Sequence, residues 1–452
     1  NNILFSPILN RQFLSLSDQC LLSAFNFTIN IFLLKNVSQS QFGFHTIAFT
    51  VMLFFISIQN ALVTTPMSIL LYTKQADAKQ NYLNSLFNGQ LIISLIVAVI
   101  SYIFIMIIGN HHLISKYKYL IICLNFTIVG FLLREFIRCC YFAKEIPFEV
   151  LRADILYISI YGVTILIIYH FFELSIYYNF ITLGTSAIII VLIHHKRLHL
   201  KLTTYDIKNS YRQNWKYGKW ALLGVTVTHL QTNSYLYLIA AIVGSVATAE
   251  ISAARMLLMP LILLQESWHK VAIPNGSRLR EEHKIKEFFF QQIGFSVAIV
   301  VIALIYVSLL FLFALPLQHY LLTSKYNNSF NYLYFFGLII AMRCILSNAS
   351  YGLQVLKHFR YLATINSITM IITLTLSYLF MLKYSTIGAL IGLIIGNTLM
   401  AIMLWIKFFF MVFIKNPKAL VNRLCVPFLL CFGLWSFSLI FIHSHYLIID
   451  CI

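Results

Sequence analysis

Long apolar runs follow one another along most of the chain, and clusters of Lys, Arg, Asn or Pro separate them. A helix needs about 20 apolar residues to cross a bilayer, so each run is long enough for one crossing. Before a central basic stretch the runs predict six spans, at residues 17–35, 43–72, 83–108, 117–141, 154–172 and 174–195. After it they predict seven, at residues 219–243, 247–273, 288–315, 329–355, 361–382, 386–414 and 424–449.

The composition agrees with this pattern. Hydrophobic residues make up 60% of the 452 residues, charged residues make up only 10%, and the mean hydropathy is +0.83. No soluble domain has this balance, which excludes a soluble enzyme, a nucleic-acid-binding protein and a secreted disulfide-rich protein. The sequence therefore predicts an all-α polytopic integral membrane protein with about 12–14 transmembrane helices.

The net charge of +18 follows from membrane topology and needs no nucleic-acid partner. Of the 32 Lys and Arg residues, 25 fall in connections on one side of the predicted membrane and five on the other. Because cytoplasmic connections are enriched in Lys and Arg, this asymmetry places the N-terminus in the cytoplasm. The two remaining cations, Arg255 and Arg343, lie inside predicted spans.

The longest connection, at residues 196–218, divides the chain into two halves. It mixes basic and aromatic side chains, so we expect it to lie on anionic lipid in the cytoplasmic headgroup zone. It separates an N-terminal six-helix lobe at 1–195 from a C-terminal six-helix lobe at 219–414. Residues 415–452 are predicted to form an additional C-terminal transmembrane helix.

The two halves share a weak pattern that favours an internal repeat. In the first half the order is Gln59, Pro66 and Asn88-Gly89-Gln90; in the second it is Gln265, Pro274 and Gln292-Ile293-Gly294. The spacings are close but not equal. We therefore expect two pseudo-repeated lobes around a central cavity, an architecture that many transporters use.

Four spans carry a row of polar side chains on one face. The rows are Gln19, Ser23, Asn26 and Asn30; Thr226, His229 and Asn233; Arg255, Glu266, His269 and Lys270; and Arg343, Ser347, Ser350, Gln354 and Lys357. A polar group in hydrocarbon is costly, so each row faces either a neighbouring helix or water. Arg255 and Arg343 have no carboxylate three or four positions away on their own helices, and we expect both to face water or an anion.

Other charged residues in the spans have simpler explanations. Glu266, His269 and Lys270 lie near the cytoplasmic end of their span, and Arg134 and Arg138 lie near the inner end of theirs, where long side chains reach the interface. Ser15 followed by Asp18 matches the capping arrangement at a helix start. The eight cysteines form no CxxC pair, so neither a metal site nor a disulfide is expected. The absence of a P-loop and of other catalytic motifs excludes ATP-driven transport within this chain.

Several short motifs resemble the O-antigen and polysaccharide flippases of the multidrug/oligosaccharidyl-lipid/polysaccharide exporter superfamily. They are Asp18-Gln19-Cys20-Leu21-Leu22-Ser23-Ala24-Phe25-Asn26-Phe27, Gln41-Phe42-Gly43, Gln59-Asn60-Ala61-Leu62 with Pro66-Met67, Tyr217-Gly218-Lys219-Trp220, Ala253-Ala254-Arg255-Met256-Leu257, and Gln354 to Arg360. The resemblance covers most of the chain. Thirteen predicted spans depart from the 12 or 14 that are usual in such proteins.

The resemblance implies a two-lobed fold in which spans 1, 2, 7 and 8 line a cavity. It also implies a substrate, polyprenyl diphosphate carrying a short glycan, that moves from the cytoplasmic to the outer leaflet for O-antigen or capsule synthesis. Arg suits this substrate because its guanidinium can hold phosphate oxygens bidentately. The candidate substrate-binding residues are Arg255, Arg343, Asn26, Asn60, Gln354 and Lys357.

The remaining expectations concern partners and location. No cofactor or metal is expected, and the chain is expected to be a transporter and not an enzyme. The expected partners are the lipid-linked oligosaccharide, membrane lipids, a polysaccharide polymerase and a chain-length regulator, but no nucleic acid. The expected location is the bacterial cytoplasmic (inner) membrane.

Two alternatives and the energy source stay open at this point. A drug or metabolite cation antiporter of the same fold is the first alternative. A membrane glycan polymerase or ligase is less favoured, because no large extracytoplasmic loop is predicted. His229 and Asp18 are candidates for coupling to an ion gradient. We favour the simpler interpretation that His229 hydrogen-bonds a neighbouring helix and that flipping runs downhill.

Overall fold

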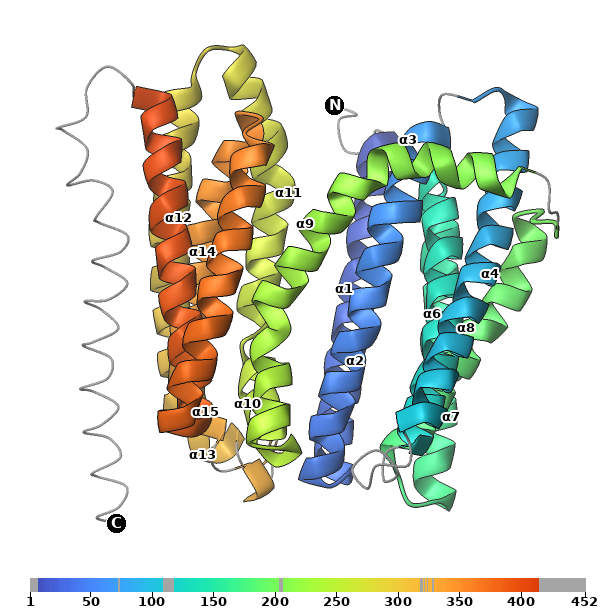
Figure 1. Ribbon diagram of the computed structural model, residues 1–452, viewed down its shortest axis with the longest axis horizontal. Coiled ribbons are helices and arrows are strands. Elements are labelled where there is room, and N and C mark those ends of the chain that lie inside the picture. Colours follow the sequence, from blue (N-terminus) through green and yellow to red (C-terminus); the bar gives the residue numbers. More distant parts are fainter. Residues whose placement is uncertain are drawn as a thin grey trace, which may run out of the picture. The chain divides into compact units, whose positions relative to one another are not determined.

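The computed structural model describes residues 7–71, 74–108, 118–202, 206–317 and 329–413, together with residues 320, 322 and 324–326 (Figure 1). Every regular element in these ranges is a helix, which confirms the all-α prediction. The chain divides into two compact units, an N-terminal unit of Asn1–Thr226 and a C-terminal unit of Val227–Ile452. The boundary lies inside the long helix α9 (Ile207–Ile242). The predicted additional helix at 415–452 lies outside the described residues.

The helices of the N-terminal unit coincide with the first six predicted spans. They are α1 (Pro7–Asn36), α2 (Gln39–Gln59), the π-helix η2 (Asn60–Thr64), α3 (Thr65–Leu70), α4 (Ala76–Ile108), α6 (Lys118–Ala143), α7 (Pro147–Phe171) and α8 (Ile176–Arg197), followed by the first part of α9. Local sequence signals set several helix starts. The Ser38 and Ser175 hydroxyls accept backbone N–H groups at the starts of α2 and α8, and Pro147 opens α7.

The C-terminal unit is also a series of long helices, and two breaks in the helices interrupt it. It contains the rest of α9, α10 (Ser245–Leu257), α11 (Met259–Glu281), α12 (Ile285–Leu312), α13 (Ala314–Leu317), the 3-10 turn η5 (Ser324–Tyr326), α14 (Ser329–Val355) and α15 (Phe359–Phe413). A 56° bend separates α10 from α11 at Leu258. Ser385 has φ 50° and ψ −134°, so α15 is two helices joined at a kink, as the separate spans predicted at 361–382 and 386–414 require.

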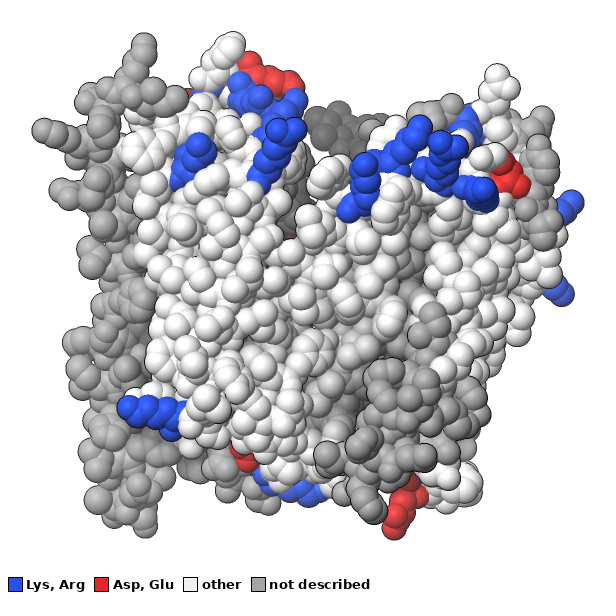
Figure 2. All heavy atoms as spheres, viewed as in Figure 1, with Lys and Arg blue, Asp and Glu red and all other residues white. Residues whose placement is uncertain are grey.

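The apolar character of these helices makes the chain a multi-pass membrane protein. Among the described residues, eight helices are long and apolar enough to cross a membrane, or nine if α10 and α11 form one span. The helices α1 and α9 fall outside this group because both carry many polar side chains. On the face shown in Figure 2, Lys and Arg gather toward the helix ends and leave the lateral surface largely uncharged.

The first half of α9, within the predicted linker, is held firmly against the N-terminal unit. Asn214 donates to the carbonyl of Val63 over 3.3 Å and accepts a hydrogen bond from the Tyr82 hydroxyl. One turn further on, a Cβ atom at Gly218 would lie only 2.6 Å from the carbonyl oxygen of Ala61. The part of the predicted linker from residue 207 onward is therefore helical and docked on η2 and α4, with its basic side chains Lys208, Arg212 and Lys216 exposed.

The glutamines of the predicted repeat occupy equivalent places in the two units. Gln59 of α2 donates to the carbonyl of Leu132 on α6 over 2.8 Å. Gln265 of α11 donates to the hydroxyl of Ser347 on α14 over 2.6 Å, beside the carbonyl of Arg343. In each unit, a glutamine from the second span thus fixes the fourth span at mid-length.

Three glycines at every fourth position let the two halves of α15 pack backbone to backbone. Added Cβ atoms would lie 2.2 Å from the Phe380 carbonyl at Gly388, 2.4 Å from the Ser377 nitrogen at Gly392, and 1.8 Å from the Thr373 hydroxyl at Gly396. Small residues at this spacing allow close approach of membrane helices.

We expect Gly392→Ala to lower the free energy of unfolding by about 1–3 kcal/mol, because the added methyl group meets backbone that cannot move aside. Thermal unfolding of the purified protein in detergent measures this loss. Gly294→Ala on α12 is the matched control, since nothing lies within 4 Å of the added Cβ, and it should be neutral or slightly stabilising. Equal unfolding temperatures for the two variants would refute the close packing of α15.

Candidate functional site

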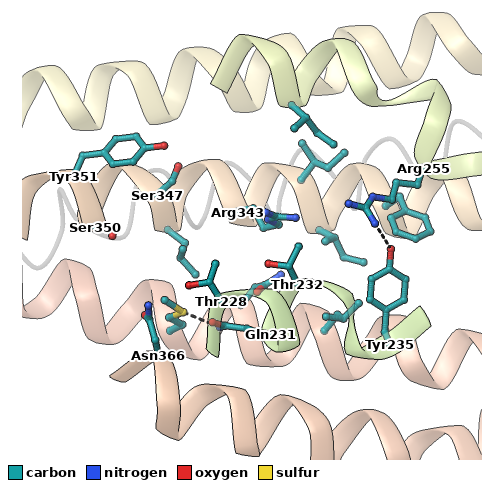
Figure 3. A pocket seen from close by; sticks show the side chains of 18 of the residues that line it. Thr228, Gln231, Thr232, Tyr235, Arg255, Arg343, Ser347, Ser350, Tyr351 and Asn366 are labelled. Carbon is teal, nitrogen blue, oxygen red and sulfur yellow. Dashed lines mark hydrogen bonds between the residues drawn. The ribbon is translucent and has the colours of Figure 1, made fainter. Parts of the chain in front are cut away.

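A cavity of about 270 Å³ lies within the C-terminal unit, among α9, α10, α11, α14 and both halves of α15 (Figure 3). Its lining includes Thr228, Gln231, Thr232, Tyr235, Arg255, Ile262, Phe336, Ile339, Ile340, Arg343, Leu346, Ser347, Ser350, Tyr351, Gln354, Asn366, Leu393, Asn397 and Met400. These side chains are mixed: two cations, several amides and hydroxyls, and an apolar remainder.

One face of α14 supplies the floor of the cavity. Its lining residues recur every three or four positions from Phe336 to Gln354, which is the spacing of one helical face. Phe336 and Gln354 are about 27 Å apart along the helix axis, at about 1.5 Å per residue. The polar row predicted on the tenth span, from Arg343 through Ser347 and Ser350 to Gln354, is part of this face.

Arg255 enters the cavity from the C-terminal end of α10, beside the break at Leu258. Its Nη1 donates to the hydroxyl of Tyr235 over 3.3 Å and to Oδ1 of Asn233 over 3.4 Å. Arg343 projects from the middle of α14, and Figure 3 shows the two guanidinium groups pointing toward each other across the cavity. Two helices that are far apart in sequence therefore place two cations in one space.

Neither guanidinium group lies within ion-pair distance of a carboxylate of the described residues. Within the part of the chain that the structure describes, neither Arg255 nor Arg343 forms an ion pair, and the cavity lining contains no Asp or Glu. Two cations facing each other in a low-dielectric space repel, and each is costly without a partner. An anion between them would relieve both penalties, so the arrangement is suited to binding a phosphate or diphosphate group.

His229 lies next to the cavity without lining it. Its Nε2 is 3.1 Å from the Tyr237 hydroxyl, and its Nδ1 is 3.4 Å from the amide nitrogen of Asn233. Asn233 in turn accepts from Arg255. His229 is thus linked to Arg255 through the side-chain amide of Asn233, which lies on the same helix as His229.

The structure does not bring all six candidate binding residues together. Arg255, Arg343 and Gln354 line this cavity. Lys357 is exposed at a positive φ of 63° just after α14 and is not among the lining residues. Asn26 is exposed on α1 of the N-terminal unit, and Asn60 opens η2, where its side-chain oxygen accepts from Thr64 over 2.8 Å.

The face of α9 that lines the cavity differs from the row predicted there. Thr228, Gln231, Thr232 and Tyr235 line the cavity. At 3.6 residues per turn they lie about 140° around the helix from the predicted row of Thr226, His229 and Asn233. Polar residues occur on both faces of this helix, and the face that lines the cavity is not the one that the row predicted. Asn397 is an isolated amide in an apolar run and carries no periodic signal. Asn366 does carry one, because Thr369, Thr373 and Ser377 follow it at the spacing of one helical face, and this row could have indicated the site.

A buried ionic cluster in the N-terminal unit corrects three further predictions. Arg138 contacts Asp154 at 2.7 Å, Asp18 at 2.9 Å and Glu135 at 2.9 Å, while Arg134 contacts Asp154 at 2.5 Å. The prediction that Arg134 and Arg138 reach the membrane interface is wrong, because Arg134 is only 2% exposed and both side chains are paired with buried acids.

The capping role predicted for Asp18 is also wrong. Its helix begins at Pro7, so Asp18 lies well inside α1, where its carboxylate pairs with Arg138. On α11, Glu266 is exposed, whereas the His269 ring stacks on Tyr351 of the cavity at 4.4 Å between ring centroids. The side chain of Lys270 lies outside the described residues. Among the described residues, no group of His, Cys, Asp or Glu could hold a metal ion.

Residues 36–331 match the model of a family described as polysaccharide biosynthesis protein, and this match spans more than half of the chain. No curated protein matches the chain by sequence. Similar solved structures provide a second line of comparison.

A lipid II flippase, MurJ, in an inward closed conformation has a TM-score of 0.71 at 16% identity, covering 96% of this chain and 100% of that one. An inward-facing multidrug resistance MATE family transporter of the MOP superfamily has a TM-score of 0.68 at 13% identity, covering 86% and 94%. A MOP superfamily transporter from Pyrococcus furiosus has a TM-score of 0.61 at 12% identity, covering 90% and 95%. At these identities the similarities establish the fold.

Proposed function

The chain belongs to the polysaccharide biosynthesis protein family, and from this premise we propose that it is a flippase for polyprenyl-diphosphate-linked oligosaccharide repeat units. It moves them from the cytoplasmic to the outer leaflet for synthesis of a surface polysaccharide, O-antigen or capsule. The protein acts as a transporter and not as an enzyme. A solved flippase of similar fold, named for lipid II, supports this class of substrate.

The observation that carries the proposal is the pair of arginines in the cavity. A diphosphate has oxygens on two phosphorus atoms and more than one negative charge, so it can meet two guanidinium groups at once. The Tyr235 hydroxyl and the Asn233 amide hold Arg255 in position for this contact. The polyprenyl tail stays in the bilayer while the charged headgroup occupies the cavity.

Translocation then requires the loaded cavity to open to one leaflet and afterwards to the other. Two units joined through one continuous helix, α9, are suited to such a motion. The bound diphosphate neutralises the arginines during the crossing, which lowers the cost of carrying charge through hydrocarbon. Release follows where the glycan is consumed, so the movement runs downhill without a nucleotide.

The main alternative is a cation antiporter, because transporters of the MATE family share the fold. A cavity for cationic drugs needs carboxylates or a neutral aromatic lining. Among the described lining residues there are two arginines and no acid, so the electrostatic preference is for anions. The same observation disfavours a role in exporting cationic metabolites.

Reconstitution tests the proposal directly. Proteoliposomes of the full chain would contain polyprenyl-diphosphate-linked N-acetylglucosamine in both leaflets, and an added galactosyltransferase would modify only outward-facing sugar. If the protein is a flippase, all of the lipid-linked sugar becomes modified. In protein-free liposomes, only the sugar in the outer leaflet becomes modified. If modification stops at the protein-free level while ethidium accumulates under a pH gradient, the antiporter is correct.

We propose in addition that the protein lies in the bacterial cytoplasmic membrane with its N-terminus inside, where a polysaccharide polymerase and a chain-length regulator would use its product. We expect Lys208→Cys, on the exposed face of α9, to resist impermeant thiol reagents in intact cells and to react after permeabilisation. Lys383→Cys, exposed beside the kink of α15, is the matched control and should react from outside. The reverse labelling pattern would show that the N-terminus lies outside the cell.

A further inference from the structure

Neutral amides from three helices meet in the cavity. Gln231 comes from α9, Asn366 from the first half of α15 and Asn397 from the second half. Gln231 is 8% exposed and Asn397 5% exposed, so both are removed from bulk solvent. Figure 3 shows Gln231 and Asn366 on the same side of the cavity, away from Arg255. The cavity thus has a cationic part and a neutral polar part.

Within the described residues, part of the hydrogen-bonding capacity of Gln231 and Asn366 is unused. Gln231 donates through Nε2 to the Thr369 hydroxyl at 3.4 Å and to the Met400 sulfur at 2.9 Å. The side-chain oxygen of Asn366 is buried and has no hydrogen-bond partner among the described residues. A buried amide oxygen without a partner carries a desolvation penalty that a ligand can remove. The amides therefore point to a ligand that both donates and accepts hydrogen bonds.

The charge of the lining residues and the volume of the cavity limit further which ligand can bind. Apart from the two arginines, the described lining residues are uncharged, and they add the hydroxyls of Thr228, Thr232 and Ser350. Tyr351, held by its stack on His269, adds a fixed aromatic ring. The volume of about 270 Å³ is near the lower limit of ligand pockets, about 300 Å³, and is too small for a whole repeat unit.

We propose that Gln231, Asn366 and Asn397 form a sugar subsite that recognises the neutral first sugar attached to the diphosphate. The hydroxyl or N-acetyl groups of that sugar donate to the amide oxygens and accept from the amide N–H groups. The Asn366 oxygen is covered in this structure, and a flip of its side-chain amide turns it toward the sugar. This inference rests on the proposed function, since the arginines must hold the diphosphate next to the subsite. It makes the first sugar, and not only the diphosphate, a determinant of substrate selection.

Binding measurements on the purified full chain in detergent test the subsite. The probes are farnesyl diphosphate and farnesyl diphosphate carrying one glucose, galactose, N-acetylglucosamine or N-acetylgalactosamine. The wild-type protein should bind at least one glycosylated probe more tightly than farnesyl diphosphate. Asn366→Ala and Asn397→Ala should each reduce that preference by about 2- to 10-fold, the worth of one neutral hydrogen bond, and leave farnesyl diphosphate binding unchanged.

Matched variants separate the possible outcomes. Ser367→Ala, the neighbour of Asn366 whose hydroxyl donates to its own helix at Ala363, should keep the full preference. Arg343→Gln should weaken all five probes alike and keep the preference; if it does not weaken farnesyl diphosphate, the proposed function fails instead. Where Asn366→Ala does not fold, Asn366→Ser carries the same prediction.

Three results would overturn the subsite. One is wild-type protein that prefers none of the four glycosylated probes. Another is a preference that survives in both asparagine variants. The third is that sodium ions stabilise the wild-type protein against thermal unfolding and do not stabilise Asn366→Ala. The amide oxygens would then bind a cation and not a sugar.

Discussion

Asp154→Ala is expected to remove most of the folded protein, with a loss of about 3–5 kcal/mol in the free energy of unfolding. Asp154 is fully buried on α7 and contacts Arg134 at 2.5 Å and Arg138 at 2.7 Å. Its removal leaves the Arg134 guanidinium, only 2% exposed, without its carboxylate. An isolated charge inside the protein costs far more than the pair contributes, which is why the effect is large. Membrane abundance and thermal unfolding in detergent measure it.

Glu149→Ala on the same helix is the matched control. Glu149 pairs with Arg152 at 2.9 Å and Arg197 at 3.3 Å, and both arginines are about half exposed. Exposed pairs of this kind contribute about 0.2–1 kcal/mol, so the control should stay close to wild type. If Asp154→Ala unfolds at the same temperature as Glu149→Ala, the buried cluster does not hold α1, α6 and α7 together.

Arg255→Ala and Arg343→Ala are each expected to weaken diphosphate binding by about 2–5 kcal/mol, or about 30-fold to several thousand-fold, and to abolish glycan export. Each replacement removes one of the two cations that face the headgroup in the cavity. Abundance should remain normal, because within the described residues neither arginine takes part in an ion pair of the fold. Surface glycan per cell and protein level per cell, measured together, separate transport from folding.

The conservative replacement sharpens this prediction. Arg343→Lys should keep part of the export, since Lys retains the charge but lacks the planar fork that binds two oxygens. Arg278→Ala is the control for charge alone, because Arg278 is exposed on α11 and lies 3.8 Å from Glu282. Wild-type export by both cavity alanine variants would rule out a binding role for the arginines.

The fold could be predicted from the sequence because the bilayer fixes the length of each apolar run. The helices α6, α7 and α14 lie where runs of about 20 apolar residues were found. Arg255 and Arg343 could be singled out because a cation in the middle of a span is rare. Both then proved to line the same cavity.

The remaining site residues could not be predicted because packing, and not spacing, unites them. Asp18 and Arg138 are 120 positions apart, and nothing near Asp18 in the sequence indicates its partner. Asn366 and Asn397 lie in different halves of α15, and only the return of the chain past its kink brings them to one cavity. A helix-capping motif was therefore assigned where a buried ion pair exists. Periodicity identifies a face of one helix, whereas a site depends on the faces of several.

A structure of the protein with bound polyprenyl diphosphate, solved by electron cryomicroscopy, would test the diphosphate site most directly. We expect phosphate oxygens at hydrogen-bonding distance, about 2.7–3.2 Å, from the guanidinium groups of both Arg255 and Arg343. The tail should leave the cavity toward lipid, and the Asn366 side should remain open for the sugar. A diphosphate bound elsewhere in the protein, with neither guanidinium group in contact with it, would contradict the proposed function.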